Sequence, residues 1–129
     1  MKFKDNEAIY IQIADLVCEN ILEGKLPMGE KIPSVRDLAI QLQVNPNTVM
    51  RSYDTLQNRE IIFNKRGLGF FVSENAQQII RTGKRQSFLK IRLPELFKEM
   101  KLLEISSAEL INLYQEYNAN LKPNHNEIQ

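Results

Sequence analysis

Residues 34–58 hold two short helical patterns separated by a break of two or three residues, and this arrangement constrains the fold more than any other feature. Ser34 precedes the first pattern and has, with Asp37, the spacing of a helix capping box. Asn45 can cap the second helix, and Pro46 suits its first position because no helical hydrogen bond is lost there. The sequence therefore predicts two helices joined by a tight turn. Their apolar faces are Val35, Leu38, Ala39 and Leu42 in the first helix and Val49, Tyr53 and Leu56 in the second.

The second helix begins with polar side chains that capping alone does not explain. A cap requires only Asn45, which leaves Asn47, Thr48 and Arg51 without a structural role. Asn and Arg present paired hydrogen-bonding groups that can read base edges, whereas Ser and Thr hydroxyls and free N–H groups at a helix start can bind phosphates. We therefore interpret residues 35–54 as a helix-turn-helix whose second helix contacts DNA.

Residues 61–72, IIFNKRGLGFFV, predict a β-hairpin with a basic tip. Such a hairpin makes the domain a winged helix, with a further helix expected over residues 8–23. Small glycines beside cations allow close approach to a neighbouring groove of DNA. The alternative is that the cations only keep the tip soluble. The tip residues in question are Lys65, Arg66, Gly67 and Gly69.

The C-terminal part of the chain carries apolar residues at alternating spacings of four and three, as in a helix–helix packing seam. Pro94 predicts a kink or short break within it. Ser106 and Glu109 form a capping box that begins a last helix. The apolar face exceeds what two helices can cover, which indicates a homodimer. The expected dimer contacts are Leu89, Leu93, Leu96, Met100 and Leu103, then Leu110, Leu113, Tyr114 and Tyr117.

These elements predict a mainly α fold with a small β-hairpin wing. We expect a winged helix-turn-helix DNA-binding domain over residues 1–74, a helical dimerisation segment over residues 75–123 and a frayed tail over residues 124–129. Residues 81–92 hold five cations and no acidic residue, and a solvated helical face is favoured over extra phosphate contacts for this run.

Composition excludes some classes of protein and leaves one alternative open. The net charge is +1, and residues 1–74 carry nine basic and ten acidic side chains, so total charge does not support DNA binding. A winged helix that binds another protein is therefore the second hypothesis. Cys18 and His125, the single cysteine and histidine, predict neither an internal disulfide nor a metal site, and we interpret Cys18 as a core residue. No signal peptide, membrane span, cofactor motif or catalytic cluster is found, so we expect a cytoplasmic protein that is not an enzyme.

The stretch GEKIPSVRDLAIQLQVNPNTVMRSYDTLQNREIIFNKRGLGFFV resembles the DNA-binding domain of the GntR family of bacterial transcription regulators. The likeness rests on three motifs in order: G-x-x-[IL]-P-S-x-R-x-L-A, V-N-P-N-T-V and R-G-x-G-x-F-V. The short tail is similar to that of the YtrA-like branch, whose two helices after the wing serve dimerisation. The resemblance implies a dimer on a pseudo-palindromic operator, often a repressor of transporter or stress operons. No small-molecule effector is required.

The resemblance also implies individual DNA contacts. Arg36 and Thr48 match family contacts, and Gly67 and Gly69 match the glycines of the wing. Three positions depart from the pattern: Pro46 and Met50 stand where many members have arginine, and Gln43 occupies a turn position usually given to glycine. The operator sequence therefore cannot be carried over from other branches, and a strained or differently closed turn is expected at Gln43.

Overall fold

The computed structural model describes residues 2–121, so the tail expected to fray over residues 124–129 lies outside the described residues. The chain folds as two units, the first ending at Arg85 and the second beginning at Gln86. Each unit has its own packing.

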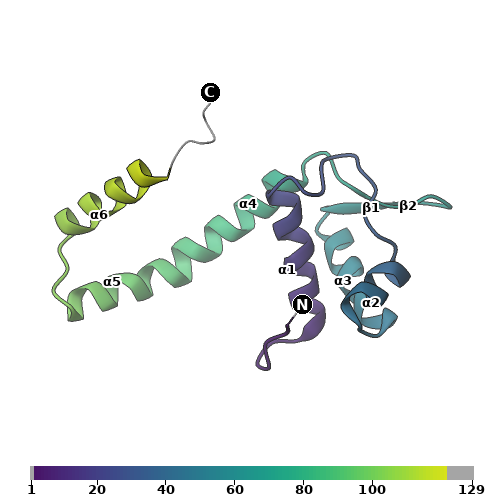
Figure 1. Ribbon diagram of the computed structural model, residues 1–129, viewed down its shortest axis with the longest axis horizontal. Helices are drawn as coiled ribbons and strands as arrows, with labels where there is room; N and C mark the ends of the chain where they lie inside the picture. Colours follow the sequence, from purple (N-terminus) through teal and green to yellow (C-terminus); the bar gives the residue numbers. More distant parts are fainter. Residues whose placement is uncertain (1, 122–129) are drawn as a thin grey trace. The chain divides into compact units, whose positions relative to one another are not determined.

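The first unit is a winged helix (Figure 1). Its helices are α1 (Ile9–Leu22), α2 (Val35–Leu42) and α3 (Pro46–Asn58), and α4 (Ala76–Ser87) begins within it. Strands β1 (Ile62–Lys65) and β2 (Gly69–Val72) pair antiparallel, from Ile62 opposite Val72 to Lys65 opposite Gly69. The mainly helical fold with a β-hairpin wing is therefore confirmed, and α1, α2, α3 and the hairpin each lie within two residues of their predicted places.

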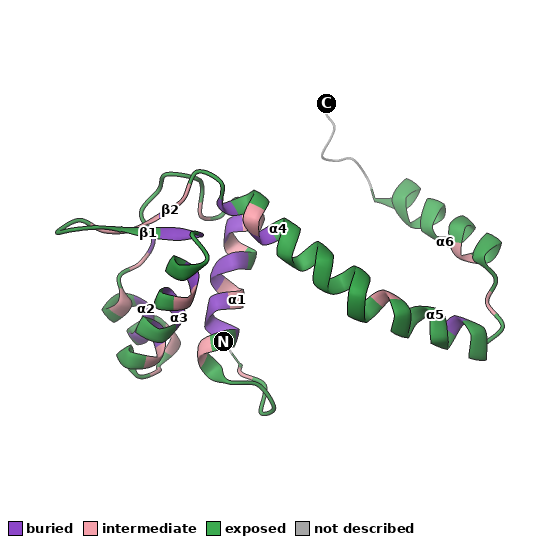
Figure 2. Ribbon diagram, turned by 180° about the vertical axis from the view of Figure 1, so that it is seen from behind, coloured by how far each residue is buried: buried purple, intermediate pink, exposed green. Residues whose placement is uncertain are grey.

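The core of the first unit lies between α1, α3 and the hairpin, where the buried residues cluster (Figure 2). Tyr53 is fully buried, and its hydroxyl donates a 2.6 Å hydrogen bond to the Pro33 carbonyl. Its ring meets Phe70 edge to face at 5.0 Å between centroids. Burial raises the pKa of the Tyr53 hydroxyl above its ordinary value. Cys18 is also buried, as predicted for a core residue, and burial raises the pKa of its thiol despite the opposing charges of Arg59 and Lys84.

Helix α4 extends this core beyond the boundary expected at residue 74. Ala76 and Ile80 are buried among the core residues, and Gln77 donates to the Ile21 carbonyl at 3.0 Å. Arg59 lies beside the helix at Gly83, where an added Cβ would lie 3.6 Å from the guanidinium, an ordinary contact distance. The first unit therefore includes the first turns of α4, because their apolar side chains complete its interior.

The turn between α2 and α3 uses a left-handed residue. Gln43 ends α2 with φ 58° and ψ 49°, and its backbone N–H bonds to the carbonyls of Ala39 and Ile40. A side chain in this conformation costs about 1–2 kcal/mol relative to glycine. The strain expected at Gln43 is therefore present, and the turn closes as it would with glycine.

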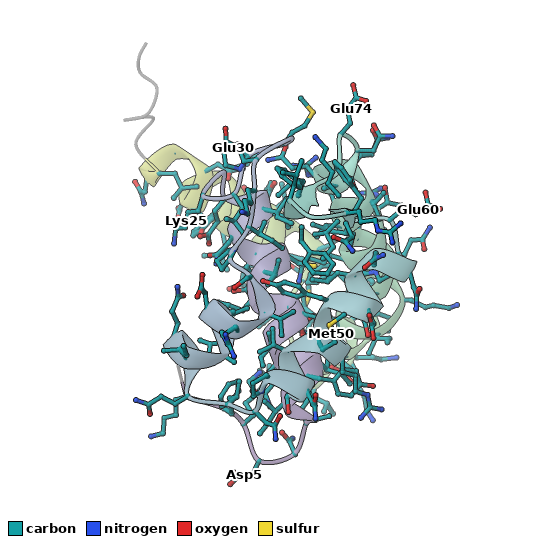
Figure 3. All side chains as sticks on the ribbon, turned by 90° about the vertical axis from the view of Figure 1, so that its right-hand side faces the viewer. Asp5, Lys25, Glu30, Met50, Glu60 and Glu74 are labelled. Carbon is teal, nitrogen blue, oxygen red and sulfur yellow. The ribbon has the colours of Figure 1, made fainter. Side chains whose placement is uncertain are left out.

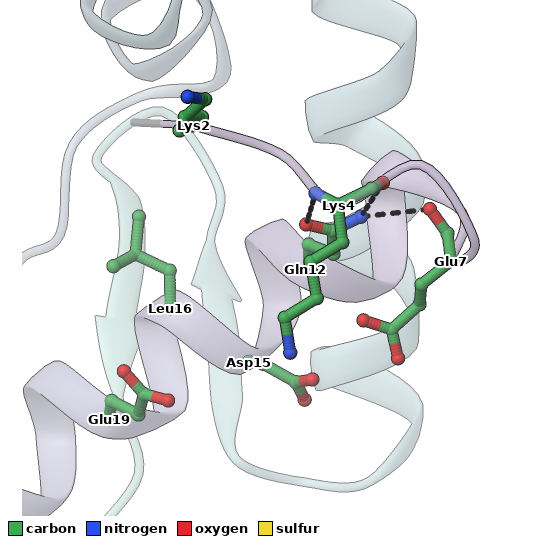
Figure 4. A pocket seen from close by; sticks show the side chains of 7 residues that line it. All are labelled: Lys2, Lys4, Glu7, Gln12, Asp15, Leu16 and Glu19. Carbon is green, nitrogen blue, oxygen red and sulfur yellow. Dashed lines mark hydrogen bonds between the residues drawn. The ribbon is translucent and has the colours of Figure 1, made fainter.

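The N-terminal segment is fixed to α1 by a buried amide. Gln12 accepts a 2.8 Å hydrogen bond from the Lys4 N–H and donates to the carbonyls of Lys4 and Glu7 (Figure 4). The amide thus both accepts from and donates to the preceding segment, which holds the chain just before α1 in place.

The second unit contains a π-helical turn η1 (Phe88–Arg92), α5 (Leu93–Leu102) and α6 (Ser107–Asn120). Pro94 has no N–H to donate to the carbonyl four residues earlier, and the Leu93 N–H instead bonds to the Phe88 carbonyl, five residues back. The interruption expected near Pro94 is thus a widened turn just before it. Ser106 caps α6 by accepting from the Glu109 N–H at 3.1 Å, as the capping box predicted.

Most apolar residues of the second unit are exposed, and Figure 2 shows α5 and α6 almost wholly in the colour of exposed residues. Met100 is buried, with 8% of its surface exposed, and Leu93, Ile105 and Leu110 are half-buried. Met100 is therefore largely covered within its own subunit. Large exposed apolar residues are Phe88, Leu89, Ile91, Leu96, Phe97, Leu102, Leu103, Ile111, Leu113, Tyr114, Tyr117 and Leu121.

Candidate nucleic-acid interface

The start of α3 is an exposed polar surface with a closed cap. Asn45 accepts a 2.8 Å hydrogen bond from the Asn47 N–H through its side-chain oxygen, and Pro46 occupies the first turn. Asn45 therefore caps the helix, while the side chains of Asn47 and Arg51 are exposed and that of Thr48 is half-buried. Val49, Ser52, Tyr53 and Leu56 are buried on the other side of α3. The helix thus divides into a docking face and a free polar face.

Arg51 does not extend freely into solvent. Its guanidinium carbon lies 3.9 Å from the centroid of the Tyr10 ring, at the start of α1. An open groove separates the starts of α1 and α3, lined by Ala8, Ile9, Tyr10, Asn47, Thr48 and Arg51. Sequence reasoning missed Tyr10, since the helical pattern of residues 8–23 gives no indication of what an individual half-buried aromatic residue contacts.

The start of α2 contributes a second polar group. Ser34 caps the helix by accepting from the Asp37 N–H at 3.0 Å, and Arg36 is exposed in the first turn. A hydroxyl that accepts from the backbone still has a proton to donate. The predicted pair Ser34 and Arg36 therefore lies at one helix start, and α2 packs directly against α3.

The wing tip is a tight reversal that presents cations. The Leu68 N–H bonds to the Lys65 carbonyl at 2.8 Å, and both Gly67 and Gly69 have positive φ, 79° and 118°. Arg66 is exposed at the tip. The Lys65 ammonium lies 4.7 Å from the ring centroid of Phe71, which stacks on Phe63 at 5.9 Å. Aromatic faces thus hold the Lys65 cation close to the strands.

Lys31 is a cation of the wing that sequence reasoning missed. It forms an isolated bridge with Phe71, which adds a short third segment to the edge of the hairpin. Its stem lies over Gly69, where a Cβ would come within 2.9 Å of the Lys31 Cε. The absence of a side chain at Gly69 therefore provides the space for Lys31, a relation that the sequence spacing does not reveal.

Ion pairing leaves these cations available. Between residues 2 and 121 the structure has one ion pair, Lys25 with Glu23 at 3.1 Å, and it involves none of the cations of α2, α3 or the wing. The same part of the chain holds no group of three or more metal-ligating side chains. No helix within it is long and apolar enough to span a membrane.

A helix-turn-helix followed by a hairpin, with unpaired polar groups along the second helix and the hairpin tip, defines the winged-helix class of DNA-binding domains. Comparison with known proteins specifies the class further. The family described as bacterial regulatory proteins, gntR family, matches residues 9–72. Relatives that match along most of the chain support the same assignment, and the chain belongs to the GntR family.

The relatives resemble the chain beyond the winged helix. The HTH-type transcriptional regulator YhcF of Bacillus subtilis is 34% identical over 110 residues, which cover 85% of this chain and 89% of YhcF. The HTH-type transcriptional repressor YtrA of the same organism is 34% identical over 119 residues, covering 92% and 91%. A crystal structure of a GntR-family regulator from Bacteroides thetaiotaomicron is 43% identical with a TM-score of 0.76, covering 89% of this chain and 100% of that one.

These findings confirm the predicted likeness to the GntR family and to its short YtrA-like branch. The chain is a DNA-binding transcriptional regulator, and the relatives are regulators rather than enzymes.

Proposed function

We propose that this chain is a cytoplasmic repressor that binds a pseudo-palindromic operator as a homodimer, with α3 in the major groove and the wing at an adjacent groove. One observation carries the proposal: the exposed Asn47 and Arg51 and the half-buried Thr48 form a polar face at the start of α3, while the opposite face of the helix is buried in the core. A helix presented in this way can enter a groove without loss of its own packing.

The side chains divide by the chemistry they offer. Asn47 and Arg51 carry paired hydrogen-bonding groups suited to base edges. Ser34, Arg36, Asn45 and Thr48 suit phosphate contacts that fix the register of the helix in the groove, the free donors of Ser34 and Asn45 remaining after each has capped its helix.

The wing is assigned to the neighbouring groove because its cations converge there. Lys65 and Arg66 lie at the tip beside Gly67 and Gly69, and Lys31 lies along the strand edge over Gly69. Five of the twelve cations of the first unit therefore lie on or beside its contact elements, although the total charge of the unit is close to zero: Lys31, Arg36, Arg51, Lys65 and Arg66. This placement answers the objection that the chain is not basic.

Dimerisation is assigned to the C-terminal hairpin, by which we mean α5, α6 and the turn between them. Leu113, Tyr114 and Tyr117 on α6 are 51%, 63% and 63% exposed, and Leu103 beyond α5 is 69% exposed. Several large apolar side chains left exposed on one helix mark a site of protein association. A second copy of the hairpin would cover it, and a two-fold axis would place two recognition helices about 34 Å apart, one turn of duplex. Leu89, Leu93, Leu96 and Leu110 would join the contact.

Repression follows from position on DNA and needs no dedicated small-molecule pocket. YtrA, to which the chain is similar over 92% of its length, is named a transcriptional repressor. A dimer bound at a promoter excludes polymerase from that site. A ligand-induced rise in melting temperature in a metabolite screen would contradict the absence of a dedicated pocket.

The test is operator binding by the full chain. Footprinting upstream of the protein's own gene identifies the operator, and gel shifts at fixed salt measure affinity. Arg36→Ala and Arg51→Ala should each weaken binding about tenfold or more, because each removes a charge-assisted contact. Lys25→Ala is the control, because it also removes one positive charge. Lys25 forms a surface ion pair with Glu23 and lies away from α3, which Met50 marks in Figure 3. This variant should leave affinity nearly unchanged.

Two outcomes would overturn the proposal. Equal affinity of Arg36→Ala, Arg51→Ala and the wild type would remove those residues from the interface. Binding to no duplex, at any salt concentration, would favour a protein-binding winged helix instead, for which the exposed Met50 and Leu68 are the available apolar contacts.

A further inference from the structure

We infer that Tyr10, on α1, is a positioning residue for DNA recognition: its ring holds the Arg51 guanidinium in the orientation in which Arg51 reads a base. This inference rests on the proposed function, because it assigns a support to a side chain that the proposal places in the major groove. It adds a specificity-determining position outside the helix-turn-helix.

The first observation is the stacking geometry. The guanidinium carbon of Arg51 lies 3.9 Å from the Tyr10 ring centroid, within the distance at which a cation is attracted by an aromatic face. Within the described residues Arg51 has no ion pair, so the Tyr10 ring is the one partner that the structure gives to its guanidinium. An exposed arginine that lacks such a partner samples many rotamers and loses that freedom on binding.

The second observation is that the position of Tyr10 is itself fixed from α3. The buried Ser52 hydroxyl donates its one proton to the Tyr10 carbonyl at 2.7 Å, and the Thr48 carbonyl is a more distant acceptor at 3.2 Å. Ser52 follows Arg51 directly, so the backbone of Tyr10 is bound to α3 by one residue and its ring is covered by the neighbouring residue. The start of α1 is held from the other side by the Gln12 amide, which binds Lys4 and Glu7. The backbone that carries the ring is therefore fixed relative to α3.

The third point is chemical. A guanidinium carbon 3.9 Å from the ring centroid is close enough for the cation to lie face to face on the ring. That arrangement uses the face of the guanidinium, whereas its N–H donors lie in the plane and point outward from the edges. An arginine stacked on Tyr10 can therefore still donate two hydrogen bonds to a guanine, a geometry that depends on the orientation of the plane. The groove beside it, lined by Ala8, Ile9, Asn47 and Thr48, leaves that edge accessible. Tyr10 thus orients the arginine without occupying its donors.

The consequence is that Tyr10 acts on discrimination between bases and not on the phosphate contacts. Loss of the ring would leave Arg51 as a mobile cation, still attracted to DNA but less selective. Affinity for the operator should fall, whereas the dependence of affinity on salt concentration, which counts phosphate contacts, should not change.

The experiment uses the full-length protein and an operator selected by the wild type from a random-sequence duplex library. Fluorescence anisotropy measures Kd for this operator and for duplexes with one base pair changed in turn. The variants are Tyr10→Leu, Tyr10→Phe, Arg51→Ala and the double variant Tyr10→Leu/Arg51→Ala. Tyr10→Phe is the matched control, since it keeps the ring face and removes only the hydroxyl.

We expect Tyr10→Leu to lower discrimination at the base pair read by Arg51 by about fivefold, the loss of one exposed cation–aromatic contact. Tyr10→Phe should retain it. In the Arg51→Ala background, Tyr10→Leu should add nothing, because its effect passes through Arg51. A purely structural role for Tyr10 would instead lower affinity equally in both backgrounds and at all base pairs.

A measurement on the wild type makes the inference independent of the folding of any variant. The Arg51 side-chain protons should show an upfield NMR shift from the Tyr10 ring, in free protein and in the operator complex. Loss of that shift in the complex, or equal defects in Tyr10→Phe and Tyr10→Leu, would overturn the inference and leave the proposed function intact. Tighter binding by Tyr10→Leu would show that the ring sequesters Arg51 and would overturn it too. Wild-type affinity of Arg51→Ala would remove Arg51 from the interface and, with it, both proposals for this residue.

Discussion

The two units of this chain differ in how far they bury their apolar residues. In the first unit the fully buried side chains come from α1, α3, the hairpin and the start of α4, and include Ile13, Tyr53, Ile62 and Ile80. In the second unit only Met100 is buried among the described residues, although α5 and α6 are rich in leucine, phenylalanine and tyrosine. The first unit therefore has a complete apolar core, whereas the second leaves most of its apolar side chains exposed.

The difference separates two uses of the same kind of sequence pattern. Amphipathic helices whose apolar faces meet within the subunit stabilise a fold, and those whose faces remain open stabilise an association. On this interpretation, substitution in the first unit should change the free energy of unfolding of one subunit. Substitution in the second should change mainly the equilibrium between subunits.

The largest effect is expected at the open face of α6. The double substitution Leu113→Lys/Tyr117→Lys should raise the dimer dissociation constant by at least about 100-fold, because two side chains that would each contribute about 1.5–3 kcal/mol on burial become charged. Sedimentation at a series of concentrations measures the change. Asn112→Lys/Gln115→Lys adds the same charge to exposed positions on the same helix, off the apolar face, and should have little effect. Equal dissociation in both variants would show that charge alone is responsible.

An intermediate effect is expected at the start of α4. Ile80→Ala should lower the free energy of unfolding of the first unit by about 3 kcal/mol, since it removes buried methylene groups and leaves a cavity. Urea denaturation followed by the signal of the tyrosines is the measurement. The exposed Gln78→Ala in the same helix is the control. A midpoint that does not move with Ile80→Ala would place the boundary of the winged-helix domain near residue 74.

The smallest effect is expected at Tyr53. Tyr53→Phe should lower the free energy of unfolding at neutral pH by about 1 kcal/mol, because the Pro33 carbonyl loses its 2.6 Å donor. The pKa of this hydroxyl is raised by burial, so the folded state retains the proton that the unfolded state releases above about pH 10. The wild type should therefore lose stability as the pH rises past that value, more than Tyr53→Phe does. A difference between the two that is constant with pH would mean that the hydroxyl titrates equally in both states.

Features that depend on neighbouring residues could be predicted from the sequence. Ser34, Asn45 and Ser106 each accept from a backbone N–H two or three residues later, so the helix starts are set locally. The antiparallel hairpin around Gly67 and Gly69 is local in the same sense. The left-handed turn at Gln43 could be expected from its place between two helices.

Features that depend on how separate elements pack together could not be predicted from the sequence. The stacking of Arg51 on Tyr10 joins α3 to α1, and the seat of Lys31 over Gly69 joins the loop before α2 to the wing. Neither spacing nor composition specifies such pairs. The apolar repeat at Leu96, Met100 and Leu103 shows the same limit. Such a repeat does not distinguish a residue buried within its own subunit, as Met100 is, from one left exposed.

The open apolar face of the C-terminal hairpin has a consequence for gene dosage. For a subunit that binds its operator only in pairs, and whose pairs are in equilibrium with single subunits, the concentration of the active form rises with the square of the subunit concentration when most subunits are single. A twofold fall in synthesis would then lower the active form about fourfold. Such a regulator, controlling its own gene, would respond to changes in its abundance more steeply than a protein with a closed C-terminal core.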